Sequence, residues 1–181
     1  QAKPVFDLYS VQLLRVAADL QKGKDMTGND LLNAPDMFIG AVVNPNFQPL
    51  ELQLMKMKKK KDAGAQFFQT QAVYDDQAID EFAERTEAFG RPVQLGEVVI
   101  KSPQMGAYMN KYVSGITVPQ DWIDEIGSVN KSDRKKKAAE MMGRFIKKHK
   151  SKFQGVHIMP LGWSDVVPDI LEQAEIEIKH N

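Results

Sequence analysis

The sequence predicts an α/β protein built on a parallel β-sheet. Short apolar segments of strand length alternate with longer segments whose apolar residues recur at helical spacing, and most links between them are short. This alternation favours a parallel sheet, because each helix returns the chain to start the next strand in the same direction. Four strands are clear and a fifth is possible, whereas a closed (β/α)8 barrel has eight strands and typically about 250 residues. The pattern leaves two architectures open, an open sheet or the second half of a barrel.

The first half of the chain contains two of the strands. Ser10 or Asp7 is expected to cap an opening helix. Residues 37–43 form a continuous apolar run, which is typical of a strand covered on both faces. The helix that follows, over residues 50–63, has a buried stripe at i, i+4 and i+7 that consists of Leu50, Leu54 and Met57. The stripe beside it is polar and consists of Gln53, Lys56 and Lys60.

A ligand-facing strand end is expected in the middle of the chain. Gly64 lies where a helix stop favours a left-handed residue. The short strand 65–68 then contains two phenylalanines and ends in a polar group, Gln69, Thr70 and Gln71. In parallel α/β folds the loops after the strands face the ligand. The amide of Gln71 can both donate and accept hydrogen bonds, so this residue is a candidate ligand contact.

The second half repeats the alternation. A cap followed by proline at the first helical position, Ser102-Pro103, marks one helix start. That helix has Met105, Tyr108, Met109 and Tyr112 at its apolar positions, and its methionine face, Met105 and Met109, is expected to belong to the core rather than to a binding site. The other expected elements are a helix over 77–89 stopped by Gly90, a strand over 93–100, a possible strand over 115–119, a short helix over 119–126, a long helix over 133–149, a strand over 155–159 and a helix over 167–178.

Composition excludes several classes of function. The chain has 181 residues, 43% of them hydrophobic and 27% charged, with a net charge of zero, so no global field favours nucleic acid or an acidic membrane. Cysteine is absent, which excludes disulfides and cysteine-ligated metals and fits a reducing, cytoplasmic location. No apolar run reaches the roughly 18 residues of a membrane span. The chain begins with Gln1, which suggests a piece of something longer.

The histidines and the most basic segment have ordinary structural interpretations. His149, His157 and His180 lack metal-ligand spacing, and His157 is expected to be a hydrogen-bonded core residue. Residues 131–152 contain ten Lys or Arg against two acids. That excess could indicate nucleic acid, but the apolar stripe of the same segment favours a solvated outer helix.

Six segments, in their order and spacing, give the chain a close resemblance to methylenetetrahydrofolate reductases. They are Lys3-Pro-Val-Phe-Asp-Leu-Tyr-Ser-Val-Gln-Leu-Leu14, Ile39-Gly-Ala-Val-Val-Asn-Pro45, Lys59-Lys-Lys-Asp-Ala-Gly-Ala65, Thr70-Gln-Ala-Val-Tyr-Asp75, Ser114-Gly-Ile-Thr-Val-Pro119 and Gly155-Val-His-Ile-Met-Pro-Leu-Gly162. The resemblance covers nearly the whole chain. It implies a (β/α)8 TIM barrel, of which residues 1–181 form a single domain covering roughly the C-terminal half, strands about 5 to 8.

The resemblance also implies a reaction. Members of the family use a flavin, FAD in the known bacterial enzymes, to pass a hydride from a reduced pyridine nucleotide to 5,10-methylenetetrahydrofolate, which gives 5-methyltetrahydrofolate. FMN in place of FAD and a redox protein as the donor stay open. The family's general acid and its Arg-Gly-Asp flavin loop belong to the part of the barrel that precedes this segment.

Site residues follow from the resemblance position by position. Gln71 matches the glutamine that binds the pterin ring of folate. The flavin-contacting positions are matched by Phe6, Asp7, Asn44, Gln53, Lys56 and Lys60. Two positions depart from the family pattern near folate, where this chain has Asn110 and Trp163.

Two points stay open at this stage. Asp75, Asp76 and Glu97 are near strand ends, but their spacing singles out no catalytic acid. The alternative to a complete enzyme is a non-catalytic fragment or split subunit, which would need an N-terminal partner or self-association to close the barrel, since unpaired sheet edges invite association.

Overall fold

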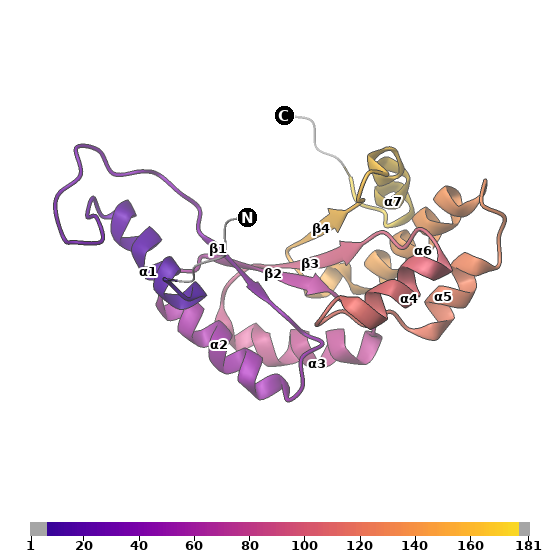
Figure 1. The fold of residues 1–181 in the computed structure, drawn as a ribbon, viewed down its shortest axis with the longest axis horizontal. Helices are drawn as coiled ribbons and strands as arrows, with labels where there is room; N and C mark the ends of the chain where they lie inside the picture. Colours follow the sequence, from indigo (N-terminus) through magenta and orange to yellow (C-terminus); the bar gives the residue numbers. More distant parts are fainter. Residues whose placement is uncertain (1–6, 178–181) are drawn as a thin grey trace.

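Four parallel strands in the order β1-β2-β3-β4 form the centre of the computed structural model, which describes residues 7–177. Each strand pairs with the next one along the chain, with helices in the connections, as the alternation predicts (Figure 1). Within residues 7–177, β1 and β4 each have one strand partner. No helix in this part of the chain is long and apolar enough to cross a membrane.

The elements follow the predicted order. The strands are β1 (Gly40–Val43), β2 (Phe67–Ala72), β3 (Val93–Val98) and β4 (Gly155–Met159). The helices are α1 (Ser10–Gln21), α2 (Leu50–Asp62), α3 (Asp76–Thr86), α4 (Pro103–Tyr112), α5 (Gln120–Gly127), α6 (Arg134–His149) and α7 (Val167–Gln173), with short 3-10 turns η1 (Glu87–Phe89), η2 (Lys150–Lys152) and η3 (Ser164–Val166).

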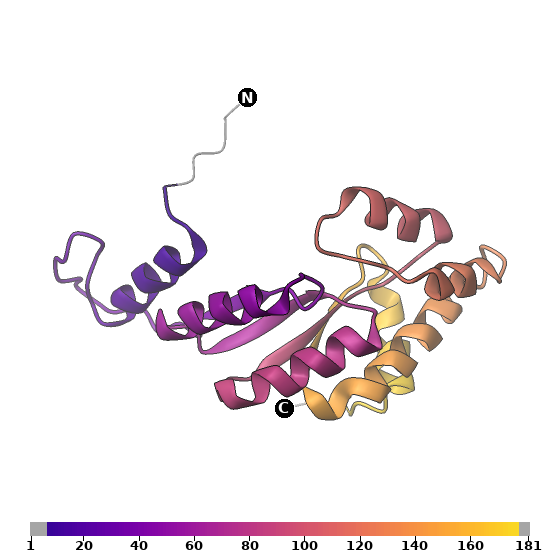
Figure 2. The ribbon, with the colours of Figure 1, turned by 90° about the horizontal axis from the view of Figure 1, so that it is seen from below.

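The helices bury one face of the sheet. Figures 1 and 2 show α2 and α3 side by side along the sheet, with α6 and α7 beyond them toward β4, while α4 lies apart from this layer, beside the strand ends (Figure 2). The helical stripes predicted from the sequence are confirmed: Leu50, Leu54 and Met57 of α2 are buried, as are Ala138, Met142, Phe145, Ile146 and His149 of α6. On the sheet, Phe68 and Leu95 face this layer and are fully buried. Removal of this apolar surface from water is the main stabilising term of the fold.

The opposite face of the sheet is open and partly polar. Val42, Gln69 and Gln94 are aligned across β1, β2 and β3, so their side chains point to the same side. Val42 is exposed and the two glutamines are half-buried. The predicted strand over 37–43, covered on both faces, is therefore wrong: only 40–43 is strand, and Phe38 is exposed and stacks on Phe67.

Strand β2 extends further than predicted. The expected strand 65–68 ended before the polar group, but β2 runs from Phe67 to Ala72 and contains Gln69, Thr70 and Gln71. The register against β3 shifts between Gln69 and Ala72. Thr70 is buried there, and its Oγ1 accepts a hydrogen bond from the backbone N–H of Gly96 at 2.8 Å. The polar residues fit because the open face tolerates amides and the shift gives Thr70 a backbone partner.

Local stop and start signals were mostly correct. Gly64 and Gly90 have φ of 115° and 58° and follow their helices, and Ser102 Oγ accepts from the N–H of Met105 to cap α4. The predicted caps of α1 are wrong: Tyr9 is the N-cap, and its N–H donates to Oε1 of Gln12.

Four expectations for the second half are also wrong. Residues 115–119 are not a strand, and β3 ends at Val98 instead of residue 100. Helix α7 ends at Gln173, short of the predicted end at residue 178, which itself lies outside the described part. On α4 the two methionines belong to the core as expected, with Met109 buried in it and Met105 packed against it, but Tyr108 and Tyr112, also expected at apolar positions, are exposed and pack on each other.

Candidate functional site

The carboxyl ends of the four strands lie along one edge of the sheet because all strands are parallel. Four loops begin there: Asn44–Pro49 after β1, Val73–Asp75 after β2, Val99–Ser102 after β3 and Pro160–Trp163 after β4. This edge is where parallel α/β proteins bind ligands. We take it as the candidate site.

The loop after β1 is fixed to its neighbours by asparagine side chains. Oδ1 of Asn44 accepts from the backbone N–H of Asn46 at 3.0 Å. Nδ2 of Asn46 donates to the carbonyls of Ala72 at 2.9 Å and Gly115 at 3.0 Å. Gly115 has φ of 83°, and a Cβ there would overlap the amide of Asn44. Asn44 therefore lies at the edge. Asn46, which the sequence analysis missed, ties this loop to the end of β2 and to the segment after α4; the Asn-Pro-Asn spacing was its only signal.

Gln71 is presented to solvent near this edge. It is the penultimate residue of β2 and is exposed, while Thr70 and Ala72 on either side are buried. Register shifts of this kind re-aim a side chain and are frequent beside active sites. The structure thus leaves the Gln71 amide available to a ligand.

The polar stripe of α2 lies beside β1. Lys60 is half-buried, and its Nζ donates to the carbonyl of Val42 at 2.6 Å. Burial lowers the pKa of the Lys60 ammonium, and the positive charge of Lys56 lowers it further. Nζ of Lys56 lies 5.5 Å from the centre of the Phe47 ring. Gln53 is half-buried on the same helix.

The flanking lysines are solvated. Lys58 pairs with Asp62 at 2.7 Å on the surface, and Lys59 is exposed. Asp7, from the predicted flavin loop, is exposed immediately before α1, and Phe6 lies outside the described residues. The structure therefore brings Asn44 and Gln71 to the edge and places Gln53, Lys56 and Lys60 along the adjoining helix.

The carboxyl groups near the strand ends have structural partners or are buried. Asp75 caps α3, since its Oδ1 accepts from the N–H of Ala78 at 2.7 Å. Asp76 contacts Lys148 and His149, and these hydrogen bonds outweigh the effect of burial, so its pKa lies below the ordinary value. Glu97 is fully buried on the same face of β3 as Leu95, and burial raises its pKa well above the ordinary value.

The histidines differ from expectation in one respect. His157 is half-buried on the open face of β4, and no described residue hydrogen-bonds its ring. The core histidine is His149, whose Nε2 lies 2.5 Å from Oδ1 of Asp76. Across residues 7–177, no cluster of His, Cys, Asp or Glu could hold a metal ion.

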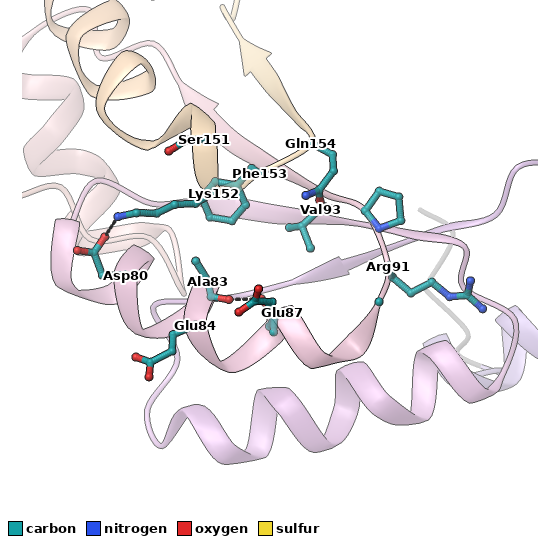
Figure 3. A pocket seen from close by; sticks show the side chains of 13 residues that line it. Asp80, Ala83, Glu84, Glu87, Arg91, Val93, Ser151, Lys152, Phe153 and Gln154 are labelled. Carbon is teal, nitrogen blue, oxygen red and sulfur yellow. Dashed lines mark hydrogen bonds and ion pairs between the residues drawn. The ribbon is translucent and has the colours of Figure 1, made fainter.

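Two cavities lie on opposite ends of the sheet. The larger, of about 700 Å³, is at the amino ends of β3 and β4 between α3 and η2 (Figure 3), with Asp80, Glu84, Glu87, Arg91 and Lys152 among its lining residues. Its position is on the face that serves stability in parallel barrels. The smaller, of about 480 Å³, lies at the carboxyl ends, between the loops after β3 and β4, and includes Trp163. Asn110 is engaged elsewhere, exchanging hydrogen bonds with the backbone of Val118.

The fold and this edge define an α/β protein with its polar groups at the ends of parallel strands, as in a part of a barrel enzyme. The family model for methylenetetrahydrofolate reductase matches residues 36–175, most of the chain. The chain belongs to this family, whose fold is a TIM barrel, whose members generally bind flavin and whose function is that of a folate one-carbon reductase. No curated protein gives a significant match.

Proposed function

We propose that the protein containing this chain reduces 5,10-methylenetetrahydrofolate to 5-methyltetrahydrofolate with a flavin cofactor and a reduced pyridine nucleotide as the electron donor. The family match over residues 36–175 is the observation on which this proposal rests. The parallel sheet with its polar carboxyl edge is compatible with it.

Gln71 is the residue we assign to the folate. It is exposed at the end of β2, on a strand whose neighbouring residues are buried and therefore well fixed. A carboxamide can donate to one atom of a pterin ring and accept from another, which suits a heterocycle that has donors and acceptors along one edge. Asn44, held by the Asn46 backbone, would lie on the flavin side of the same edge.

The residues of α2 fit the anionic part of a flavin nucleotide. Lys56 and Lys60 lie one turn apart on one stripe with Gln53. Lys60 uses one of its three ammonium donors on the Val42 carbonyl, which leaves two for phosphate oxygens. FAD, which we favour over FMN because of its second phosphate, would supply the hydride-transfer chemistry when bound. The protein residues named here, with Asp7 and Phe6 on the preceding segment, would bind and orient it.

A complete site would need further strands. Within the described residues each outer strand of the sheet has one neighbour, and the family fold is a closed barrel. We propose that the remaining βα units, on the same polypeptide or on a partner subunit, pair with β1 and β4 and supply the general acid. An alternative source of closure is a second copy of the chain.

The reaction is tested by visible spectroscopy of the purified full-length protein. We expect flavin absorbance that NADH or NADPH bleaches and that methylenetetrahydrofolate restores. A protein that copurifies without flavin and does not take up FAD or FMN would contradict the proposal. Bleaching only by a reduced iron–sulfur protein would contradict the assigned donor and retain the reaction.

Two variants test the residue roles. Lys60→Ala should weaken flavin binding about tenfold, the usual loss for one charge-assisted hydrogen bond, whereas Lys59→Ala, an exposed neighbour, should leave it unchanged. Gln71→Ala should raise the KM for folate about tenfold with flavin content unchanged. Equal flavin affinity in the Lys59 and Lys60 variants would exclude the phosphate role of Lys60.

A further inference from the structure

One asparagine side chain joins three segments at the carboxyl edge of the sheet. Asn46 lies in the loop after β1 and is half-buried. A carboxamide has two N–H donors, and the Nδ2 of Asn46 donates to the carbonyls of Ala72 at 2.9 Å and Gly115 at 3.0 Å. These partners lie 26 and 69 residues further along the chain. The side chain therefore connects parts of the fold that the sequence keeps far apart.

The Asn46 amide continues the pairing of β2 beyond the end of β1. In the register of the sheet, the last residue of β1, Val43, lies opposite Thr70. Strand β2 continues to Ala72, so its last two residues extend past β1. Backbone groups at such a position need a partner from elsewhere, and the Asn46 amide supplies the donor for the Ala72 carbonyl. The end of β2 is thereby held where β1 no longer covers it.

This contact acts on Gln71 through the backbone. Gln71 directly precedes Ala72, and its side chain is exposed, so the backbone at the end of β2 determines where its amide points. On the other side of β2 the register against β3 shifts between Gln69 and Ala72, which interrupts the regular ladder there as well. The hydrogen bond from Asn46 is thus one of the interactions that fix this strand end.

Asn46 also orients Asn44. The backbone N–H of Asn46 donates to Oδ1 of Asn44 at 3.0 Å, which fixes the direction of that amide. Nδ2 of Asn44 then lies against the backbone of Gly115, where an added Cβ would overlap it. The loop after β1, the end of β2 and the segment after α4 therefore form one junction, and Asn46 contacts all three parts of it.

We propose that Asn46 is a positioning residue for the reaction, which holds the folate-side residue Gln71 and the flavin-side residue Asn44 in a fixed relative placement. The inference rests on the proposed function, because that proposal assigns these two residues to the folate and the flavin. Transfer between two bound molecules requires their close approach and correct orientation. A carboxamide suits the role because it has one donor for each of two carbonyls, whereas an aspartate of the same shape has none when ionised.

Asn46→Ala in the full-length protein tests the role. The change removes both side-chain donors, and it should raise the dissociation constant of the flavin and the KM for methylenetetrahydrofolate, each about threefold to tenfold. A residue that only stabilised the fold would reduce the amount of active protein, which lowers kcat and leaves both constants unchanged. Asn33→Ala, at an exposed position in the loop before β1, is the matched control and should change none of the three values.

Double variants identify the residues through which Asn46 acts. In a Gln71→Ala background, Asn46→Ala should add little to the KM for the folate, because the side chain that it positions is already gone. In an Asn44→Ala background it should likewise add little to the flavin dissociation constant. If Asn46→Ala does not fold, Asn46→Ser, which keeps one donor, is measured in its place with the same expected direction.

The results separate the positioning role from the proposed function. Full additivity in both double variants would overturn the positioning role, as would ligand constants in Asn46→Ala equal to those of the unchanged protein. An unchanged protein that neither binds flavin nor reduces the folate would contradict the proposed function, and the positioning role with it. An unchanged protein that does both, while only kcat falls in Asn46→Ala, would contradict the positioning role alone.

Discussion

Replacing Glu97 should make the protein more stable at neutral pH. This carboxyl is fully buried in β3, and neither of its oxygens has a hydrogen-bond partner among the described residues. Burial raises its pKa well above the ordinary value of 4.5. Glu97→Gln keeps the shape and removes the ionisable proton, so the comparison isolates the cost of holding the acid neutral.

The sign and size of the expected difference in unfolding free energy follow from proton linkage. Below about pH 4.5 the carboxyl is protonated in both the folded and the unfolded protein, and Gln and Glu should differ little. Above that pH the unfolded chain releases the proton while the folded chain keeps it, so the wild type loses about 1.4 kcal/mol of unfolding free energy per pH unit. The loss stops when the pH reaches the folded pKa. The variant has no such term, so its advantage grows with pH over that range.

The assay is urea unfolding followed by circular dichroism at pH 4, 5, 6 and 7. For a chain of this size each kcal/mol also shifts the melting temperature by about 2–4 °C. Glu84→Gln is the matched control, because Glu84 is exposed and outside the ion pairs of the described part. A Glu97→Gln protein that is less stable than the wild type at pH 7 would refute the reasoning, since it would mean that the carboxylate has a favourable partner.

Three further changes test the packing around the sheet. Tyr74→Phe removes a buried hydroxyl that donates to a strand carbonyl at 2.7 Å, and should lower the unfolding free energy by about 1 kcal/mol in urea titrations. Gly96→Ala should cost about 1–3 kcal/mol by the same measurement, because the added methyl would overlap the backbone of Thr70. His149→Phe should reduce the loss of stability on acidification below about pH 4, because the hydrogen bond to His149 helps to lower the pKa of Asp76, and the stability that the lowered pKa provides at higher pH is lost as the pH falls; unchanged acid melting curves would contradict this.

The helical part of the fold was predictable because amphipathic stripes report burial directly. Leu50, Leu54 and Met57 were expected to face the core and do so, and the long helix over 133–149 begins only one residue later than predicted. Single residues such as Gly64 stop helices through local backbone preference, which requires no knowledge of the rest of the fold.

Strand limits and sheet faces were less predictable because they depend on neighbours far along the chain. Gln69 and Gln71 were interpreted as the end of a strand because they are polar, yet both are inside β2, on a sheet with one open face. Val42 was expected to be buried because β1 is apolar, but β1 has one strand neighbour in the described residues and its outward side chains are exposed. Polarity alone does not separate a loop from the open face of a sheet.

The candidate site, too, was predictable only in part. The positions of Asn44 and Gln71 at the carboxyl edge followed from the order of strands, since any residue after a parallel strand reaches that edge. The cavity lined by Lys101, Trp163 and Arg134 could not be predicted in this way, because these residues come from three separate segments. The interpretation of residues 131–152 as a solvated helix face holds for most of that helix, whose apolar stripe is buried against the sheet. It fails at the first turn, where a helix end meets two strand-end loops and the same positive charge becomes part of a cavity. A charge pattern along one helix therefore describes that helix, and only the sheet topology determines which of its residues reach the edge where ligands bind.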